Sequence, residues 1–527
     1  MLTIFFQYIL LILAILLLVM LAQKLKIAYP IVLVLGGLAL SMFNVMRGIE
    51  IDPELILVIF LPPLLYEAAW FTSWKEFWKW RRVIASFAFL IVIVTAFVIA
   101  FVSSWIIPGF TLALGFLLGG IVSPPDAVSA TSILKYVKVP RRLSAIIEGE
   151  SLLNDASSLI VFRFALVAVD TGRFIFHEAA LSFVIVIVMG IVTGIVIGLI
   201  YYVVHKWLRS DPNVNIILTL TAPYVMYIVA EMFHFSGVLS VVSGGLFLSI
   251  RSHRFLSHRA RLRGANVWSA LGFVLNGLVF MLIGLELPVI IDQLGDASLM
   301  DAIKYGVIIT AVLIVTRILC TLGASAFTVF ISRFITTADN RPGWRGPLIF
   351  GWAGMRGVVS LAAALSIPVY MTNGAEFPQR NLILFITFTV ILLTLVIQGL
   401  TLPLVIKWLN MKDPDALIPV EEQEILLRQA LAKDSMQFLD EQHTEILRTN
   451  KALQQLRSKL ESELSTFANT DDIQPGDFHR VYLSLLAQQR SFLTELNKKS
   501  ETNEDIIRKQ LGLLDLEEEK LTLRSEH

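Results

Sequence analysis

Charged and amide side chains interrupt one apolar segment of the chain, residues 146–162, which reads IIEGESLLNDASSLIVF. The segment carries Glu148, Glu150, Asn154 and Asp155 within about two helical turns. An ionised side chain near the centre of a bilayer costs about 2.5–3.5 kcal/mol on insertion scales, so the residues that remain there usually mark a transport pathway. We therefore interpret this segment as part of a path for an ion or a proton.

Helical spacing sorts these side chains onto two faces. Glu148, Ser151 and Asp155 are separated by three and four residues and share one face, whereas Glu150 and Asn154 lie on another. Asp155 falls near the middle of the predicted span, and Glu148 lies about 10 Å nearer the cytoplasm, in an expected funnel. A polar seam between helices is the alternative interpretation, but such seams use Ser, Thr and Asn rather than three carboxylates.

A second segment, GGIVSPPDAVSAT at 119–131, cannot form a continuous helix. Pro124 and Pro125 lack backbone donors and must break the helix in mid-span. The break leaves free carbonyl groups, including that of Pro125, and places Asp126 beside them. Irregular backbone at this depth is tolerated only where it is buried or lines a cavity, and the carbonyl ends of half-helices can bind a cation.

A matching interruption occurs at 351–368, GWAGMRGVVSLAAALSIP, where Gly351, Gly354 and Gly357 surround Arg356. It lies seven predicted spans after the first break. This displacement predicts two inverted six-helix repeats joined by one further span, with two crossing discontinuous helices. Paired interruptions of this kind are the best indication in a sequence of the binding site of a secondary transporter.

Further charges inside the predicted spans need partners. Glu67 follows another Pro-Pro pair in LPPLLYEAAW, and Arg317 lies near the middle of VLIVTRILCTL. Because an unpaired arginine in the bilayer is prohibitively costly, each arginine needs a carboxylate or carbonyl partner. We assign Glu150 to Arg317 and Arg356 as a structural ion pair, without deciding which arginine it contacts.

Three charged residues are predicted nearer the outer surface. We expect Arg163 to have a structural or interfacial role. Glu231 and Glu286 lie near the ends of their spans, and we expect them to be cap or rim residues.

The composition is that of a membrane protein with many spans. Of the 527 residues, 56% are hydrophobic and only 16% are charged, against about 25% charged in soluble proteins. The single cysteine, Cys320, excludes an intramolecular disulfide and a cysteine-based metal site. We find no cofactor motif and expect neither an enzyme nor a nucleic-acid partner.

Thirteen apolar segments are predicted to span the membrane. They are residues 3–23, 28–45, 53–72, 83–107, 110–134, 143–169, 179–204, 214–233, 236–250, 268–291, 302–332, 346–371 and 382–406. One alternate set of connections holds 22 lysines and arginines, and the other holds only Arg47, Arg173 and Arg380. By the positive-inside rule the N-terminus lies outside and the C-terminus lies in the cytoplasm. We therefore expect a multi-pass protein of the cell (inner) membrane.

The composition changes from about Asp413 onwards, where Glu, Gln, Lys and Leu dominate. Apolar residues recur at helical spacing from Ile446 to Leu464, and the sequence IQPGD at 473–477 separates a second helical stretch. The chain therefore divides into a membrane domain, 1–410, and a cytosolic helical tail domain, 411–527. A solvated helical hairpin and a regulatory or dimer-contacting module are both compatible with this tail.

The motifs EGESLLNDA, SPPDAV and GWAGMRGVVSLA together resemble those of the monovalent cation/proton antiporter family that contains the bacterial NhaP-type and animal NHE-type exchangers. The similarity covers about residues 1–410. It implies an all-α fold of thirteen helices in inverted repeats, a homodimer in the lipid bilayer, and electroneutral exchange of Na⁺ or Li⁺ for H⁺. One departure is that Pro125, Asp126 and Ala127 stand where many relatives have Thr-Asp-Pro, which removes a threonine hydroxyl.

By matched position, the resemblance makes Asp155 the carboxylate that binds the ion and the proton, with Asn154 beside it. Ser151, Glu67 and the break at Pro125 and Asp126 would complete the site for the transported cation. Glu150 with Arg317 and Arg356 would hold the core together.

Elementary chemistry agrees with exchange at Asp155. A hard cation takes oxygen ligands, which carboxylate, hydroxyl and carbonyl groups provide. An empty, ionised carboxylate is costly in a dehydrated intermediate, whereas either loaded form is neutral. A cation channel is the first alternative, but it would need a continuous pore. An intramembrane aspartyl protease would need a second catalytic aspartate in a Gly-x-Gly-Asp motif, which no span contains.

Overall fold

The computed structural model describes residues 2–42, 53–134, 137, 139–172, 176–207, 211–294, 298–334, 343–411, 420–468, 475–497 and 504–525. These residues form two compact units, 1–413 and 414–527. Arg47 and Arg173, which contributed to the predicted orientation, and Ile473, at the predicted break in the tail, lie outside the described residues.

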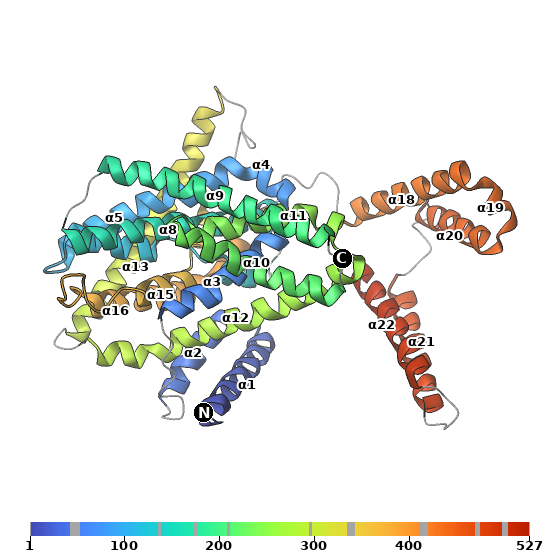
Figure 1. Ribbon diagram of the computed structural model, residues 1–527, viewed down its shortest axis with the longest axis horizontal. Coiled ribbons are helices and arrows are strands. Elements are labelled where there is room, and N and C mark those ends of the chain that lie inside the picture. Colours follow the sequence, from blue (N-terminus) through green and yellow to red (C-terminus); the bar gives the residue numbers. More distant parts are fainter. Residues whose placement is uncertain are drawn as a thin grey trace. The chain divides into compact units, whose positions relative to one another are not determined.

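The first unit is built from helices that run roughly alongside one another (Figure 1). In order, they are α1 (Leu2–Leu25), α2 (Tyr29–Ser41), α3 (Pro53–Phe71), α4 (Trp74–Ala85), η2 (Ser86–Ile91), α5 (Val92–Ile106), α6 (Leu112–Val122), α7 (Ala127–Leu134), α8 (Arg141–Thr171), α9 (Phe176–Trp207), α10 (Pro212–Met232), α11 (Gly237–Phe255), α12 (His258–Asp292), α13 (Leu299–Ile331), α14 (Arg345–Trp352), α15 (Val358–Leu365), α16 (Arg380–Leu393), η3 (Thr394–Gln398) and α17 (Gly399–Leu409).

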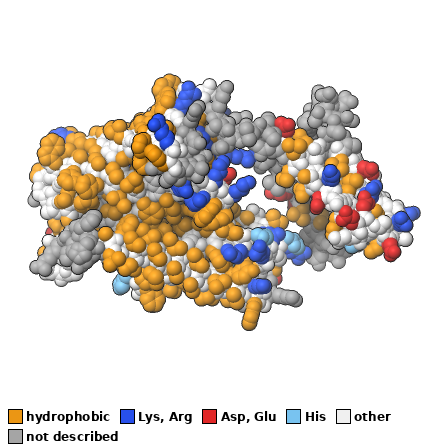
Figure 2. Space-filling model, turned by 90° about the horizontal axis from the view of Figure 1, so that it is seen from above, with side chains coloured by type: hydrophobic (Ala, Val, Ile, Leu, Met, Phe, Trp, Pro, Cys, Tyr) orange, Lys and Arg blue, Asp and Glu red, His pale blue; other side chains and the backbone are white. Residues whose placement is uncertain are grey.

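Within the described residues, nine helical stretches are long and apolar enough to cross a bilayer, and two shorter apolar helices accompany them. Hydrophobic side chains cover most of the visible surface of this unit, and Lys and Arg gather toward one end (Figure 2). The chain is therefore a multi-pass helical membrane protein, in agreement with its composition.

Two helices extend beyond the apolar segments that the sequence predicts. α12 begins at His258, ten residues before the predicted span, and α4 begins at Trp74 rather than at residue 83. Hydropathy detects only the lipid-facing length, whereas long basic side chains let a helix continue into the interface. The Ser257 side chain accepts a hydrogen bond from the Ala260 amide (3.3 Å) and so caps the start of α12.

Two short π-helical stretches, η2 and η3, interrupt otherwise regular helices. The hydropathy pattern did not predict them, because a π turn leaves the apolar character of a span unchanged. In η2 the wider turn presents the Ala88 carbonyl to the Ser157 hydroxyl of α8, which donates to it at 2.5 Å. Such bulges concentrate near functional sites, and η2 lies against the helix that carries Asp155.

Small residues allow close packing between helices in the membrane unit, as is typical in lipid. A Cβ at Gly37 of α2 would lie 3.1 Å from Cα of Gly284 in α12. A Cβ at Gly119 of α6 would likewise overlap the carbonyl oxygen of Ala96 in α5 and would lie 3.0 Å from its carbonyl carbon. These glycines therefore let α2 approach α12 closely and α6 approach α5 closely.

The second unit consists of α18 (Val420–Gln442), α19 (Thr444–Thr449), α20 (Lys451–Ala468), α21 (Pro475–Asn497) and α22 (Glu504–Ser525). Helix α18 packs on α20, and α21 packs on α22. Exposed ion pairs join the members of each pair: Arg457 lies 3.0 Å from Asp440, and Arg490 lies 2.7 Å from Asp515. These helical pairs leave both predicted roles of the tail open.

Candidate functional site

The first predicted break separates α6 from α7. The helix ends at Val122, and a new helix begins at Ala127. The Asp126 carboxylate accepts hydrogen bonds from the Val128 amide (3.1 Å), the Ser129 amide (3.2 Å) and the Ser129 hydroxyl (2.5 Å). Asp126 therefore caps α7, which is the arrangement that stabilises a helix N-terminus.

The second break separates α14, which ends at Trp352, from α15, which begins at Val358. It meets the first break directly, because the Asp126 amide donates to the Met355 carbonyl at 2.7 Å. The two interrupted helices therefore cross, and each break supplies a partner for a backbone group that the other leaves free.

The buried side chain of Arg356 joins the two breaks. Its guanidinium donates to the carbonyl groups of Val122 (2.8 Å) and Ser123 (3.1 Å), and also to the carbonyl of Gly354. The side chain is completely buried. The sequence left open whether Glu150 contacts Arg317 or Arg356. In place of Glu150, the structure gives Arg356 the carbonyl groups at the C-terminal end of α6, whose partial negative charge stabilises a cation.

A close approach at Gly357 makes the crossing possible. A Cβ at this position would lie 2.5 Å from Oδ2 and 2.7 Å from Cγ of Asp126. We expect Gly357→Ala to push Asp126 away from α7, to lower the melting temperature and to impair function. Gly323→Ala in α13 is the matched control, because a Cβ there meets no heavy atom within 4 Å. Equal melting temperatures of the two purified variants would contradict this role for Gly357.

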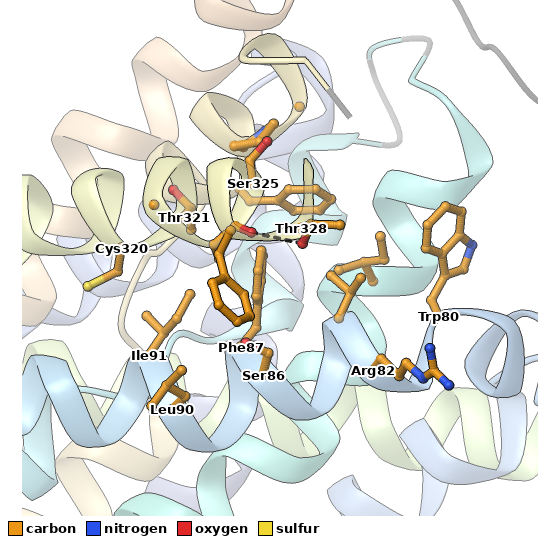
Figure 3. Close-up of a pocket in the computed structure, with 18 of the residues that line it drawn as sticks. Trp80, Arg82, Ser86, Phe87, Leu90, Ile91, Cys320, Thr321, Ser325 and Thr328 are labelled. Carbon is orange, nitrogen blue, oxygen red and sulfur yellow. Dashed lines mark hydrogen bonds between the residues drawn. The ribbon is translucent and has the colours of Figure 1, made fainter. Parts of the chain in front are cut away.

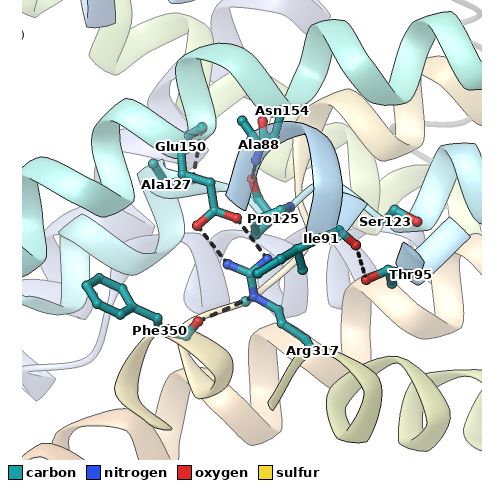
Figure 4. Close-up of polar contacts among 12 residues, drawn as sticks. Ala88, Ile91, Thr95, Ser123, Pro125, Ala127, Glu150, Asn154, Arg317 and Phe350 are labelled. Carbon is teal, nitrogen blue, oxygen red and sulfur yellow. Dashed lines mark hydrogen bonds and ion pairs between the residues drawn. The ribbon is translucent and has the colours of Figure 1, made fainter. Parts of the chain in front are cut away.

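Helix α8 contacts the first break with two polar side chains. The Asn154 amide donates to the Pro125 carbonyl at 2.9 Å, and the Ser151 hydroxyl accepts from the Ala127 amide at 3.3 Å. Figure 4 shows Asn154 pointing to Pro125. The structure thus brings together four of the predicted site residues, Ser151, Asn154, Pro125 and Asp126.

Asp155 follows Asn154 and lies one turn after Ser151. Its side chain is 7% exposed, and its carboxylate receives no hydrogen bond or ion pair from the part of the chain that the structure describes. A buried carboxylate without such partners is stable only when it holds a proton or a cation. This property distinguishes Asp155 from the other acidic residue buried in the same helix.

That other residue is Glu150, which forms a bidentate pair with Arg317 (Figure 4). Nη2 lies 2.9 Å from Oε2 and Nη1 lies 2.9 Å from Oε1. Arg317 also donates from Nε to the Phe350 carbonyl in α14 at 3.3 Å. Both side chains are almost fully buried. The pair links α8, α13 and α14, and the carboxylate is already neutralised.

The remaining predicted residues lie around this centre. Glu67 of α3 faces α12, where its carboxylate occupies the space that a side chain at Gly272 would need. Glu148 is half-buried and lies two residues before Glu150 on α8, on a different face of the helix. Arg163 pairs with Glu231, whose other oxygen accepts from the Gly237 amide at 3.0 Å, so Glu231 caps α11.

Sequence reasoning missed Thr394 and Ser129. The Thr394 hydroxyl accepts from the Arg356 amide (3.2 Å) and thereby positions the second break. Ser129 binds Asp126. Hydroxyl residues are common in apolar helices, where they bond to their own backbone, so their sequence pattern carries only a weak signal.

A helical membrane unit in which two interrupted helices cross beside a buried carboxylate is the architecture of a secondary transporter. The family model "Sodium/hydrogen exchanger, transmembrane" matches residues 10–408. The chain belongs to this family.

The relatives agree with this assignment. A low-affinity Na⁺/H⁺ antiporter of Synechocystis, NhaS1, is 32% identical over 90% of this chain and 89% of its own length. A sodium, potassium, lithium and rubidium/H⁺ antiporter of Bacillus pumilus is 34% identical over 72% of this chain, which spans only 57% of that protein. The solved antiporter MjNhaP1 of Methanocaldococcus jannaschii matches 78% of this chain and 99% of its own with a TM-score of 0.58 at 17% identity. This last similarity supports the fold.

Proposed function

We propose that this protein exchanges a monovalent cation, Na⁺ and also Li⁺, for H⁺ by alternating access at Asp155. The observation that carries the proposal is the contrast within α8. Glu150 is neutralised by Arg317, whereas the buried Asp155 has no partner in the described chain. Asp155 is therefore the carboxylate that needs a transported ion or a proton to become neutral.

The surrounding groups suit a hard cation. Ser151 offers a hydroxyl oxygen, and the Pro125 carbonyl retains a lone pair beside its bond from Asn154. We propose that these oxygens, with Asp155 and Glu67, form the cation site. Asp126 also accepts hydrogen bonds from the first amides of α7. We propose that these bonds keep the break between α6 and α7 accessible to α8.

Neutralisation also gates the conformational change. The ionised, empty carboxylate would be dehydrated when the two halves of the site close around it, at a cost of several kcal/mol. A proton or a cation removes this penalty, so only loaded forms cross between the two open states. Coupled exchange follows without ATP, and supports a role in pH and sodium homeostasis.

We further propose the topology that exchange requires. Helix α11 and the broken pair α14–α15, added to the nine spans and the two shorter apolar helices, make thirteen membrane segments in two inverted repeats. The charge bias supports an outer N-terminus and a cytoplasmic C-terminal tail in the cell membrane. A homodimer is part of the same proposal.

The decisive experiment uses everted membrane vesicles with an acidic lumen and a fluorescent pH probe. We expect the lumen to become alkaline on addition of Na⁺ or Li⁺, at a rate that saturates as the cation concentration rises. The same assay with K⁺ tests the selectivity for the cation. A cation channel would instead give a flux without counter-movement of protons. Either a non-saturating flux or a flux without proton movement would overturn the proposal.

The stoichiometry is a separate prediction. Because Asn154 cannot titrate, Asp155 alone provides the exchangeable charge, and one H⁺ should move for one cation. Transport in liposomes should therefore not respond to an imposed membrane potential, and solid-supported-membrane recordings should show no steady current. A clear current would indicate a second titrating carboxylate, with Glu67 and Asp126 the first to test.

A further inference from the structure

A cavity of about 980 Å³ lies in the membrane unit, and none of the proposed ion-binding residues lines it. One wall is formed by α4, η2 and the start of α5, and the opposite wall by α13 and α14 (Figure 3). Its volume is in the range of sites that hold a sizeable organic ligand. The distribution of side chains along the cavity indicates what kind of ligand fits.

One end of the cavity is basic. Lys79, Arg81 and Arg82 of α4 and Arg142 of α8 line it, and the lining residues that the structure describes include no Asp or Glu. The hydroxyl groups of Ser325 and Thr328 lie at the same end of α13 and donate to the carbonyl groups of Gly343 and Ala324. The four cationic side chains form a surface that attracts a phosphate group.

The other end is apolar. Leu90, Ile91 and Val94 line it from one wall and Cys320 from the other. Val94 lies twelve residues beyond Arg82, which corresponds to about 18 Å along the helix. Leu90 and Phe327 are 61% and 62% exposed on the apolar outer surface, so the cavity opens sideways toward lipid. A ligand that follows this path must change from charged to aliphatic along its length.

We propose that this cavity binds one anionic phospholipid, with its phosphate among the basic residues of α4 and its acyl chain between η2 and α13. A free phosphate would leave the apolar walls without a partner. A zwitterionic lipid would satisfy the walls but would bring no net charge to the four cations. An anionic phospholipid matches both ends and can enter directly from the bilayer.

The bound lipid would stabilise the Arg317–Glu150 ion pair, which links α8, α13 and α14. The Phe350 ring lines the cavity and packs edge-on against Phe87 with centroids 5.5 Å apart, while the Phe350 carbonyl accepts from Arg317. An acyl chain against this ring holds α14 and so the position of the Arg317–Glu150 pair. The lipid is therefore a structural ligand rather than a transported one.

The test is native mass spectrometry of the purified full-length protein, titrated with phosphatidylglycerol or phosphatidylcholine. We expect one phosphatidylglycerol to bind in preference to phosphatidylcholine. Replacing Lys79 and Arg82 by Gln should weaken its binding about 25-fold, at about fivefold for each charge near the membrane surface. Arg259→Gln, an exposed basic residue outside the cavity, is the matched control and should bind as the parent does.

A second variant tests the site by shape. Gly323 lines the cavity, and a Cβ there meets nothing within 4 Å, so the side chain of Gly323→Trp starts in open space and should fill part of the cavity. It should lose the bound phosphatidylglycerol although every charge is kept. The single Cys320 gives an independent readout, because phosphatidylglycerol nanodiscs should slow its reaction with N-ethylmaleimide relative to phosphatidylcholine nanodiscs.

Any one of three results would overturn the proposal. The first is equal binding of the two lipids, and the second is unchanged phosphatidylglycerol binding in both the Gln and the Trp variants. The third is an equal rate of Cys320 reaction with maleimide in the two kinds of nanodisc. Protection of Cys320 by soluble glycerol phosphate alone would show that the site holds a free anion and would equally exclude a lipid.

Discussion

Asp155→Asn is expected to give a folded, normally expressed protein that exchanges no cation at any pH. The substitution keeps the size of the side chain and removes both the proton site and the anionic ligand. Everted vesicles that contain the variant should show no pH recovery with Na⁺, Li⁺ or K⁺. Residual sodium-driven proton movement would contradict the proposed mechanism, and Asp126 or Glu67 would then be the candidate for the carboxylate that binds the ion and the proton.

Asp170→Asn provides the matched control on the same helix. Asp170 lies at the C-terminal end of α8, where its carboxylate accepts from the Thr372 amide (2.9 Å) and the Thr372 hydroxyl (2.8 Å). Because this carboxylate is remote from the crossing, its replacement should leave exchange intact. Loss of exchange in both variants would show that the assay reports expression or folding rather than the chemistry of Asp155.

Competition at one carboxylate also predicts the pH profile of the parent protein. Protons displace the cation as the pH falls, so the apparent affinity for sodium should decrease. At high pH the proton to be exchanged becomes scarce, and the rate should fall again. A bell-shaped profile whose acidic limb shifts with sodium concentration is the expected result. An acidic limb that is insensitive to sodium would exclude a shared site.

Glu150→Ala is expected to have the largest effect on stability. It leaves the guanidinium of Arg317 buried without its carboxylate, and breaking a buried ion pair in this way costs about 3–5 kcal/mol. The purified variant should melt at a clearly lower temperature and should be expressed poorly. An Ala variant that is as stable as the parent, and only shifts ion affinity, would place Glu150 in the transport site.

Glu231→Ala serves as the comparison for Glu150→Ala. It also breaks a pair with an arginine, Arg163, but the two side chains are 26% and 44% exposed. Water can solvate the arginine that remains, so the loss of stability should be smaller. A larger loss of stability for Glu231→Ala than for Glu150→Ala would contradict the conclusion that the buried Glu150–Arg317 pair stabilises the protein more than the exposed pair does.

Much of the candidate site could be predicted because the bilayer penalises polar groups. Glu150, Asp155 and Arg317 stand out in apolar segments, and two prolines before Asp126 exclude a continuous helix. The same penalty predicts a helical fold, since only internal hydrogen bonds satisfy the backbone in lipid. These inferences need composition and spacing alone.

Pairing could not be predicted in the same way. We assigned one carboxylate, Glu150, to two buried arginines, and only the packed helices show that Glu150 pairs with Arg317 while Arg356 binds the carbonyl end of α6. Prolines reveal where carbonyl groups are left free, but the sequence does not show which side chain binds them. A helix end becomes an ion partner only when tertiary packing brings a side chain to it.

The sequence by itself therefore determined the class of protein, the positions of both breaks and the residues able to carry charge within the membrane. The tertiary structure decided which of those charges are neutralised, and so which one is left for an ion. It also created the cavity between α4 and α13, whose walls are distant in the chain. The reason is physical: the cost of burying a charge is local to a residue, whereas its compensation depends on groups that only folding brings together.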